Sequence, residues 1–260
     1  MIFISSLLKS RFPMIYKQLN HQLKLKEIDN TNDIWVRDFM PIQNTIKENV
    51  LFRYYPKYLQ NKRFIDKISD NVLICNQLSI DCQLSNLILD GGSVVSCNEK
   101  FFVSTRVLKD NFRQTQSQII QQLQSILKSD KIYLIPEAPG DFTGHLDGML
   151  TFIDENTVLV NQYLEEFGTI LNTVLKKLGF DIVLFPYQPY QNKTFQSARG
   201  VYMNFLKTSN KILLPVFNMP EDDDALKILD DYFPKHEIIP VTCTGLENEG
   251  GLVHCITWGD

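Results

Sequence analysis

Hydrophobic and polar positions along the chain repeat in the order strand, strand, helix, strand. Residues 147–186 show this order best, with an alternating apolar run, a short strand at 157–160, an amphipathic helix near 164–178 and a buried strand at 181–185. Apolar residues at every second position predict a strand with one buried face, and apolar residues that recur about every 3.6 positions predict a helix. The order recurs in three further segments: 93–135, 201–241 and, more weakly, 40–89.

The two ends of the chain supply a fifth, divided unit. The N-terminus contributes a strand, a helix near 14–25 and a second strand, and LVHCIT at 252–257 predicts a C-terminal strand. The other predicted helices lie within 60–78, at 116–129 and at 221–233, and a further strand is expected at 201–205. Five ββαβ units in a cyclic array, closed by pairing of the termini, would bury every apolar face. An ordinary doubly wound sheet has the same alternation, so periodicity leaves both α/β architectures open.

Composition narrows the class of protein. There are 26 Lys and Arg against 30 Asp and Glu, and this net charge of −4 disfavours a nucleic-acid partner. The five cysteines show neither CxxC pairs nor zinc-site spacing, which favours a reducing compartment. No apolar stretch approaches the length of about 18 residues that spans a membrane, and the N-terminal stretch has neither the basic region nor the cleavage site of a secretion signal. We expect a cytoplasmic protein with a single domain over residues 1–260 and no membrane partner.

Side chains of reactive types recur near the start of each predicted unit, 51 to 59 residues apart. They are Asp38, Asp90, His145 with Asp147, Asn204 and Cys255. Equivalent positions in a cyclic array face one axis, so the spacing predicts that a thiol, an imidazole, an amide and three carboxylates converge.

Each of these residues also has an ordinary structural interpretation. A cysteine is usually a small buried apolar residue, but Cys255 follows a Gly-Gly pair, which indicates close approach by a ligand or another backbone. In a strand, His254 would point away from Cys255, so His145 is the better partner for the thiol. Asp90 could be a hairpin turn residue, and Asp38 could form a local ion pair with its neighbour Arg37.

A further aromatic residue and the HxD spacing complete the candidate site. Trp35 is expected to be half buried. In the functional alternative, it lines the mouth of a pocket. Asp147 lies two residues after His145 and shares its face if the segment is extended. A histidine held by a local carboxylate is the structural alternative for that pair.

The combination of groups limits the chemistry. One histidine, several hard carboxylates and one soft thiolate suit no common metal ion well. A cysteine protease could use Cys255, His145 and Asn204 but leaves the three carboxylates unexplained. Carboxylates raise the pKa of a nearby thiol unless a bound cation neutralises them. A planar guanidinium or amidinium, which carboxylates bind through paired hydrogen bonds, meets this requirement.

Five motifs resemble, in order, those of the agmatine deiminase and microbial-type peptidylarginine deiminase family, within the guanidino-group-modifying superfamily. They are WVRD, LDGG, GHLDG, YMNF and EGGLVHCIT, and the resemblance covers nearly the whole chain. It implies a five-bladed α/β propeller of ββαβ units with pseudo-five-fold symmetry. It also implies the site roles: Cys255 as nucleophile, His145 as general acid and base, and Asp38 and Asp147 as guanidinium-binding carboxylates. Asp90 would support His145, Asn204 would assist the nucleophile, and Trp35 joins the substrate-binding group.

The resemblance implies a hydrolase that releases ammonia through a covalent thiouronium, without cofactor or metal. Agmatine, giving N-carbamoylputrescine for putrescine synthesis, is the first expected substrate; peptidyl arginine is the alternative. An amidinotransferase and a catalytically silent propeller that binds cations stay open. The expected partner is a small guanidine, and a homodimer is a candidate assembly. Asp90 stands where many relatives have Glu, Leu252 where many have Asn, and the chain is shorter than typical agmatine deiminases.

Overall fold

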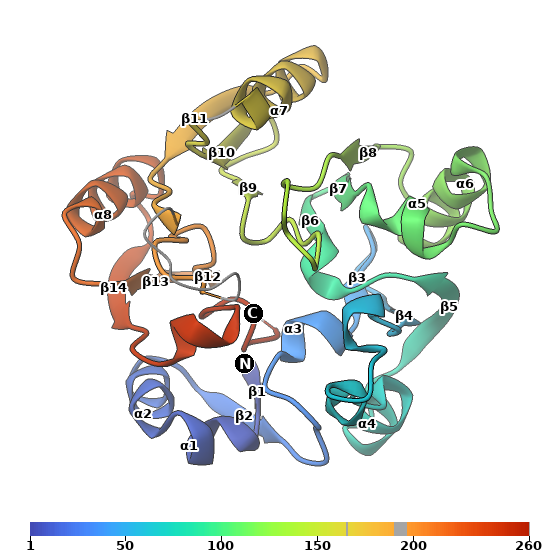
Figure 1. Ribbon diagram of the computed structural model, residues 1–260, viewed down its shortest axis with the longest axis horizontal. Coiled ribbons are helices and arrows are strands. Elements are labelled where there is room, and N and C mark those ends of the chain that lie inside the picture. Colours follow the sequence, from blue (N-terminus) through green and yellow to red (C-terminus); the bar gives the residue numbers. More distant parts are fainter. Residues whose placement is uncertain (165, 190–196, 260) are drawn as a thin grey trace.

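The strands in the described part of the chain form five small sheets around a common centre, with the longer helices on the outside (Figure 1). The computed structural model describes residues 1–164, 166–189 and 197–259. Strands and helices alternate along the chain, which confirms the predicted α/β class.

Four of the sheets have three strands and the same connections. The first strand runs antiparallel to the second, and the third runs parallel to the second after a helical crossover. The four sheets are β3 (Ile42–Gln43), β4 (Asn49–Arg53), β5 (Cys82–Ile88); β6 (Val94–Cys97), β7 (Lys100–Ser104), β8 (Ile132–Ile135); β9 (Leu150–Phe152), β10 (Thr157–Asn161), β11 (Asp181–Phe185); and β12 (Leu206–Lys207), β13 (Lys211–Val216), β14 (Glu237–Thr242). Each lies in one of the four segments with the repeated sequence pattern.

The fifth sheet joins the two ends of the chain. It contains β1 (Ile2–Ser5) and β2 (Leu25–Ile28), which run parallel. Phe3 of β1 also forms an antiparallel bridge to Trp258, with N–O distances of 2.7 and 3.0 Å. The first and last described residues therefore lie near each other close to the centre of the molecule (Figure 1).

The α-helices begin and end close to the predicted limits in most units. They are α1 (Leu7–Arg11), α2 (Pro13–Gln22), α3 (Val36–Phe39), α4 (Asn71–Gln77), α5 (Arg106–Asp110), α6 (Gln116–Leu127), α7 (Glu166–Lys177) and α8 (Glu221–Tyr232). The helix predicted within 60–78 is shorter than expected, because it begins only where Asp70 accepts a hydrogen bond from Leu73 N. Residue 165, in the helix predicted near 164–178, lies outside the described residues.

Short 3-10 turns occupy several loops that approach the centre: η1 (Lys57–Leu59), η2 (Ile65–Lys67), η3 (Gly91–Ser93) and η5 (Leu246–Glu249). The outer helices cover the sheets with apolar stripes. In α6, for example, Ile119, Leu123 and Leu127 are fully buried at intervals of four residues. Burial of each such side chain contributes roughly 1.5–3 kcal/mol to the free energy of folding. No helix in the described ranges is both long and apolar enough to cross a membrane.

Two predicted strands are wrong. Residues 252–257 form a turn instead of a strand, and in 201–205 only Val201 makes a bridge, to Tyr187. The backbone N–H groups of this C-terminal turn bind a side chain and loop carbonyls instead of a neighbouring strand. In particular, Asn204 accepts hydrogen bonds from the backbone of the turn. Apolar pattern alone could not distinguish this buried turn from a buried strand.

Candidate active site

The loops at the inner ends of the sheets bring the predicted reactive residues into one buried cluster. Their exposed fractions lie between 3 and 8%, for Asp38, Asp90, His145, Asp147, Asn204 and Cys255. They come from α3, the loop before η3, the turn before β9, the loop before β12 and the C-terminal turn.

The Cys255 thiol lies between an amide and a carboxylate. Asn204 Nδ2 donates to Cys255 Sγ at 3.1 Å, and the thiol donates to Asp147 Oδ2 at 3.4 Å. Asn204 Oδ1 also accepts from Leu252 N at 3.0 Å and Cys255 N at 3.3 Å. Its backbone oxygen accepts from His254 N at 3.0 Å. Asn204 thus fixes both the sulfur and the turn that carries it.

Carboxylates approach both nitrogens of the His145 ring. Nε2 lies 3.2 Å from Asp90 Oδ2, and Nδ1 lies 3.5 Å from Asp38 Oδ1. Within the described ranges, Asp38 Oδ1 is buried without a hydrogen-bond partner. The predicted support of His145 by Asp90 therefore has a direct geometric basis, and Asp38 keeps an oxygen available for another donor.

The Gly-Gly pair after Asp90 permits this close packing. Gly92 O accepts from Leu146 N at 2.8 Å and from Asp147 N at 3.2 Å, so the two loops are bonded together. A Cβ at Gly92 would lie 2.6 Å from His145 Nδ1. The segment that carries His145 and Asp147 is a turn, so the extended segment considered from the sequence is wrong, although both side chains still reach the same cluster.

Burial and mutual charge shift the proton affinities of the cluster. Burial, with Asp147 and Asp38, raises the pKa of the Cys255 thiol well above its ordinary value. Burial opposes the charged form of His145, but Asp38, Asp90 and Asp147 outweigh it and raise its pKa to about 10. Burial raises the pKa of Asp38 to about 7 although the His145 charge opposes this. Without a ligand the site therefore holds a protonated thiol and an imidazolium.

Trp35 closes the cluster on the side of the nucleophile. A Cβ at Gly251 would lie 2.7 Å from the Trp35 ring and 3.2 Å from Cys255 Sγ. Only a glycine at position 251 leaves room for both the indole ring and the sulfur next to the backbone. The half-buried position expected for Trp35 is confirmed, beside the sulfur.

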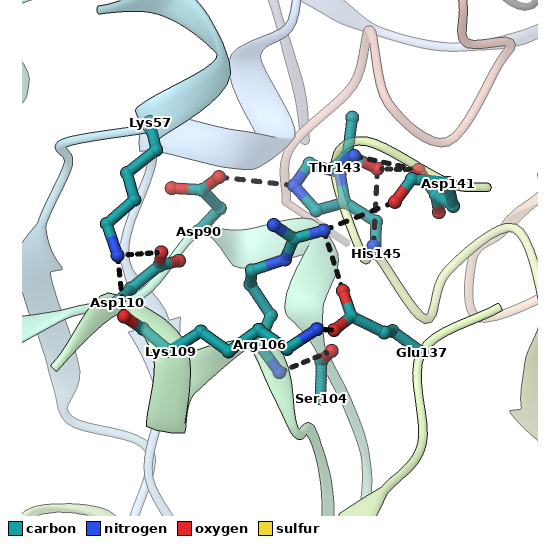
Figure 2. Close-up of polar contacts among 10 residues, drawn as sticks. All are labelled: Lys57, Asp90, Ser104, Arg106, Lys109, Asp110, Glu137, Asp141, Thr143 and His145. Carbon is teal, nitrogen blue, oxygen red and sulfur yellow. Dashed lines mark hydrogen bonds and ion pairs between the residues drawn. The ribbon is translucent and has the colours of Figure 1, made fainter. Parts of the chain in front are cut away.

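Arg106 fixes the loop that leads to His145 and was not found from the sequence. Its Nη2 lies 2.6 Å from Glu137 Oε2 and donates to Asp141 O at 3.2 Å (Figure 2). Asp141 in turn accepts from the Thr143 hydroxyl at 2.7 Å, and Thr143 Oγ1 accepts from His145 N at 3.2 Å. An arginine at the start of a helix has no chemical motif around it, so only spatial proximity identifies this role.

Tyr58 is a second residue missed by sequence reasoning. Its hydroxyl donates to Asp90 Oδ2 at 3.2 Å, and its ring lies edge-on to His145 with centroids 6.2 Å apart. It comes from η1, just before the segment 60–78 in which the sequence predicted a helix. No spacing rule connects it with the other site residues.

The remaining candidates do not supply side chains to the reactive cluster. Arg53 is exposed and stacks on Tyr55. Arg37 N donates to Cys255 O at 3.1 Å, so its backbone belongs to the wall of the site. Burial and the Arg37 charge lower the pKa of His254 well below its ordinary value. Among the described residues, no three His, Cys, Asp or Glu side chains are placed to share a metal ion.

The arrangement combines a potential nucleophile, a proton donor and an acidic pocket. The thiol and the imidazole share the carboxylates Asp38 and Asp147, whose charges act on both groups. A cation bound by these carboxylates would lower the thiol pKa and leave the imidazolium as the proton donor. An anionic ligand would be repelled by these carboxylates.

The chain is similar in sequence and fold to known deiminases. The family model described as "Porphyromonas-type peptidyl-arginine deiminase" matches residues 13–259. The agmatine deiminase of Medicago truncatula is 26% identical over 211 residues, which span 66% of this chain and only 56% of that protein. The solved structure of C. jejuni agmatine deiminase is 24% identical, with a TM-score of 0.73 over 90% of this chain and 75% of that one. The Enterococcus faecalis agmatine deiminase structure is 20% identical, with a TM-score of 0.72 over 98% and 81%.

Proposed function

The chain belongs to the Porphyromonas-type peptidyl-arginine deiminase family, and on this premise we propose that it hydrolyses a guanidino group to a ureido group with release of ammonia. The observation that carries the proposal is the buried contact of Cys255 with both Asn204 and Asp147, within the carboxylate cluster that also holds His145. A thiol placed only for packing needs neither partner.

Asp38 and Asp147 bind the guanidinium in this proposal. Both are buried, at 7% and 5% exposure, and Asp38 Oδ1 has no hydrogen-bond partner in the described ranges. Each charged hydrogen bond to a carboxylate contributes about 1.5–3 kcal/mol. The bound cation offsets the carboxylate charges, so the Cys255 proton leaves to solvent and a thiolate forms beside the guanidinium carbon.

The first half-reaction forms a carbon–sulfur bond. The Cys255 thiolate attacks the guanidinium carbon, and the imidazolium of His145 gives its proton to the departing nitrogen, so that ammonia leaves and a thiouronium remains. Asp90, 3.2 Å from His145 Nε2, orients the ring for this transfer. Asn204 Nδ2 holds the sulfur at 3.1 Å.

The second half-reaction breaks that bond. His145, now neutral, takes a proton from water while the water oxygen attacks the thiouronium carbon. Collapse of the tetrahedral adduct expels the Cys255 thiolate and leaves the ureido product. The remaining proton passes to solvent, and with ammonia it gives ammonium, so the sum is guanidinium plus water to urea derivative plus ammonium.

Agmatine is the first substrate we propose, with N-carbamoylputrescine as product in putrescine synthesis, because the agmatine deiminases of Medicago truncatula and C. jejuni resemble this chain. Peptidyl arginine is the second candidate, favoured by the name of the matching family. The five sheets support a five-bladed propeller as the finer description of the fold. A single domain, a homodimer and a cytoplasmic location stay predictions.

An ammonia-release assay over agmatine, free arginine and arginine-ending peptides tests this proposal. We expect activity with one class and loss of at least about 10⁴-fold in Cys255→Ser, because the nucleophile is removed. Cys243→Ser is the matched control, since Cys243 is buried outside the site. Ammonia release that survives Cys255→Ser would refute the covalent mechanism. A haloacetamidine that fails to label Cys255 would favour the silent propeller, and transfer of the amidino group to an amine instead of water would favour an amidinotransferase.

A further inference from the structure

Tyr58 shares one carboxylate oxygen with His145. The phenol donates to Asp90 Oδ2 at 3.2 Å, the same oxygen that lies 3.2 Å from His145 Nε2. The phenol ring is edge-on to the imidazole and also contacts Phe142, with centroids 5.5 Å apart. Tyr58 therefore contacts both members of the Asp90–His145 pair.

A carboxylate oxygen with two donors holds each donor less strongly. The phenol withdraws part of the negative charge that Asp90 directs at the imidazole. Burial and Asp90 raise the pKa of Tyr58 well above its ordinary value, so the phenol stays a donor across the working pH range. The sharing is thus a fixed property of the site.

Three carboxylates and one phenol face His145. Asp38 comes from α3, Asp90 from the loop before η3, Asp147 from the same turn as His145, and Tyr58 from η1. In the proposed reaction, Asp38 and Asp147 are occupied by the guanidinium. Asp90 is then the carboxylate that controls whether His145 can give up its proton and return as a base.

We propose that Tyr58 is a positioning residue that weakens the hold of Asp90 on the His145 proton and so lets the imidazole act as a base in the water-activating step. This inference rests on the proposed function for its catalytic consequence. Its electrostatic part concerns the four groups around the ring and Tyr54, which acts on Tyr58, and it can be measured in an inactive protein.

The test is a titration of His145 by ¹⁵N NMR in protein labelled at its four histidines, with the signal assigned by its loss in His145→Asn. Tyr58→Phe keeps the ring contacts and removes only the hydroxyl. We expect the His145 pKa to rise by about 0.5–1 pH unit. Tyr55→Phe, on an exposed tyrosine three residues away, should leave it unchanged.

A double-mutant cycle shows whether the effect passes through Asp90. In an Asp90→Asn background, Tyr58→Phe should no longer move the His145 titration. An unchanged or lowered pKa in Tyr58→Phe, or an equal rise in the Asp90→Asn background, would overturn the proposal. In the ammonia assay, kcat of Tyr58→Phe should fall about 3- to 30-fold with KM within about threefold. Absence of ammonia release from every guanidine would refute the proposed function but leave the NMR result interpretable.

Discussion

Removal of the Asp147 charge should make the thiol more reactive and the enzyme less active. In Asp147→Asn the side chain keeps its size, but the carboxylate 3.4 Å from Cys255 Sγ becomes neutral. Burial and the Asp147 charge are the two largest causes of the raised thiol pKa. The thiol should therefore ionise at lower pH, while the guanidinium loses one of its two proposed carboxylates.

The geometry sets the size of both effects. Two unit charges 3.4 Å apart interact by about 5 kcal/mol at an effective dielectric constant of 20, which equals about 3–4 pH units of thiol pKa. Burial also raises the pKa of Asp147 itself, because it opposes the charged form of the carboxyl. We expect the thiol pKa to fall by about one to three pH units. Loss of two charged hydrogen bonds to the substrate should lower kcat/KM by about 10²- to 10⁴-fold.

The assay measures alkylation of Cys255 by iodoacetamide between pH 6 and about 10.5, around the ordinary thiol pKa, with the Cys255 peptide quantified by mass spectrometry. Iodoacetamide is neutral, so its rate follows the thiolate fraction and not binding to the acidic pocket. Asp231→Asn, an exposed carboxylate on α8, is the matched control. An alkylation profile that stays in place or moves to higher pH would refute the electrostatic reasoning. Unchanged kcat/KM would refute the assignment of Asp147 to the substrate.

Three further substitutions test other parts of the site. His145 has a folded pKa of about 10, above the ordinary 6.5, so its stabilising contribution is complete below pH 6.5 and is lost as the pH rises through 10. Across this window the free energy of unfolding of the wild-type protein, measured in urea, should fall by about 1 kcal/mol per pH unit relative to that of His145→Asn. An equal pH dependence of the two free energies would contradict this. Asn204→Ala leaves Leu252 N and Cys255 N without their acceptor and should lower the unfolding free energy by about 2–4 kcal/mol in the same assay; a loss below about 1 kcal/mol would argue against it. Gly144→Ala places a Cβ within 2.6–2.7 Å of Glu137 and Arg106, at a backbone φ of +69° that favours glycine. The substitution should displace His145 and lower kcat about tenfold. An unchanged kcat would contradict this prediction.

Local pattern was sufficient for most of the fold. The α/β class, the repeated order of elements and helices such as α6 and α8 follow from periods of 2 and 3.6, which reflect how each segment buries one face. The pattern failed at 252–257, where the apolar residues are buried in a turn whose N–H groups bind Asn204 and loop carbonyls. A buried turn and a buried strand look the same in apolar content, and the distant acceptor is invisible along the chain.

The sequence by itself determined which reactive groups gather. Asp38, Asp90, His145, Asn204 and Cys255 stand at nearly equal intervals, and a repeated unit places equivalent positions at equivalent points in space. The glycines beside these residues indicated the close packing that the structure shows at Gly92 and Gly251.

Only the tertiary structure decided how these groups act on one another. The sharing of Asp90 Oδ2 by Tyr58 and His145, and the bonds of Arg106 to the loop before His145, join elements that no motif connects. The proton affinities also come from the assembled site, because burial and three neighbouring carboxylates act over a few ångströms. Residue type and spacing specify the groups, whereas their charge states depend on distances that exist only after folding.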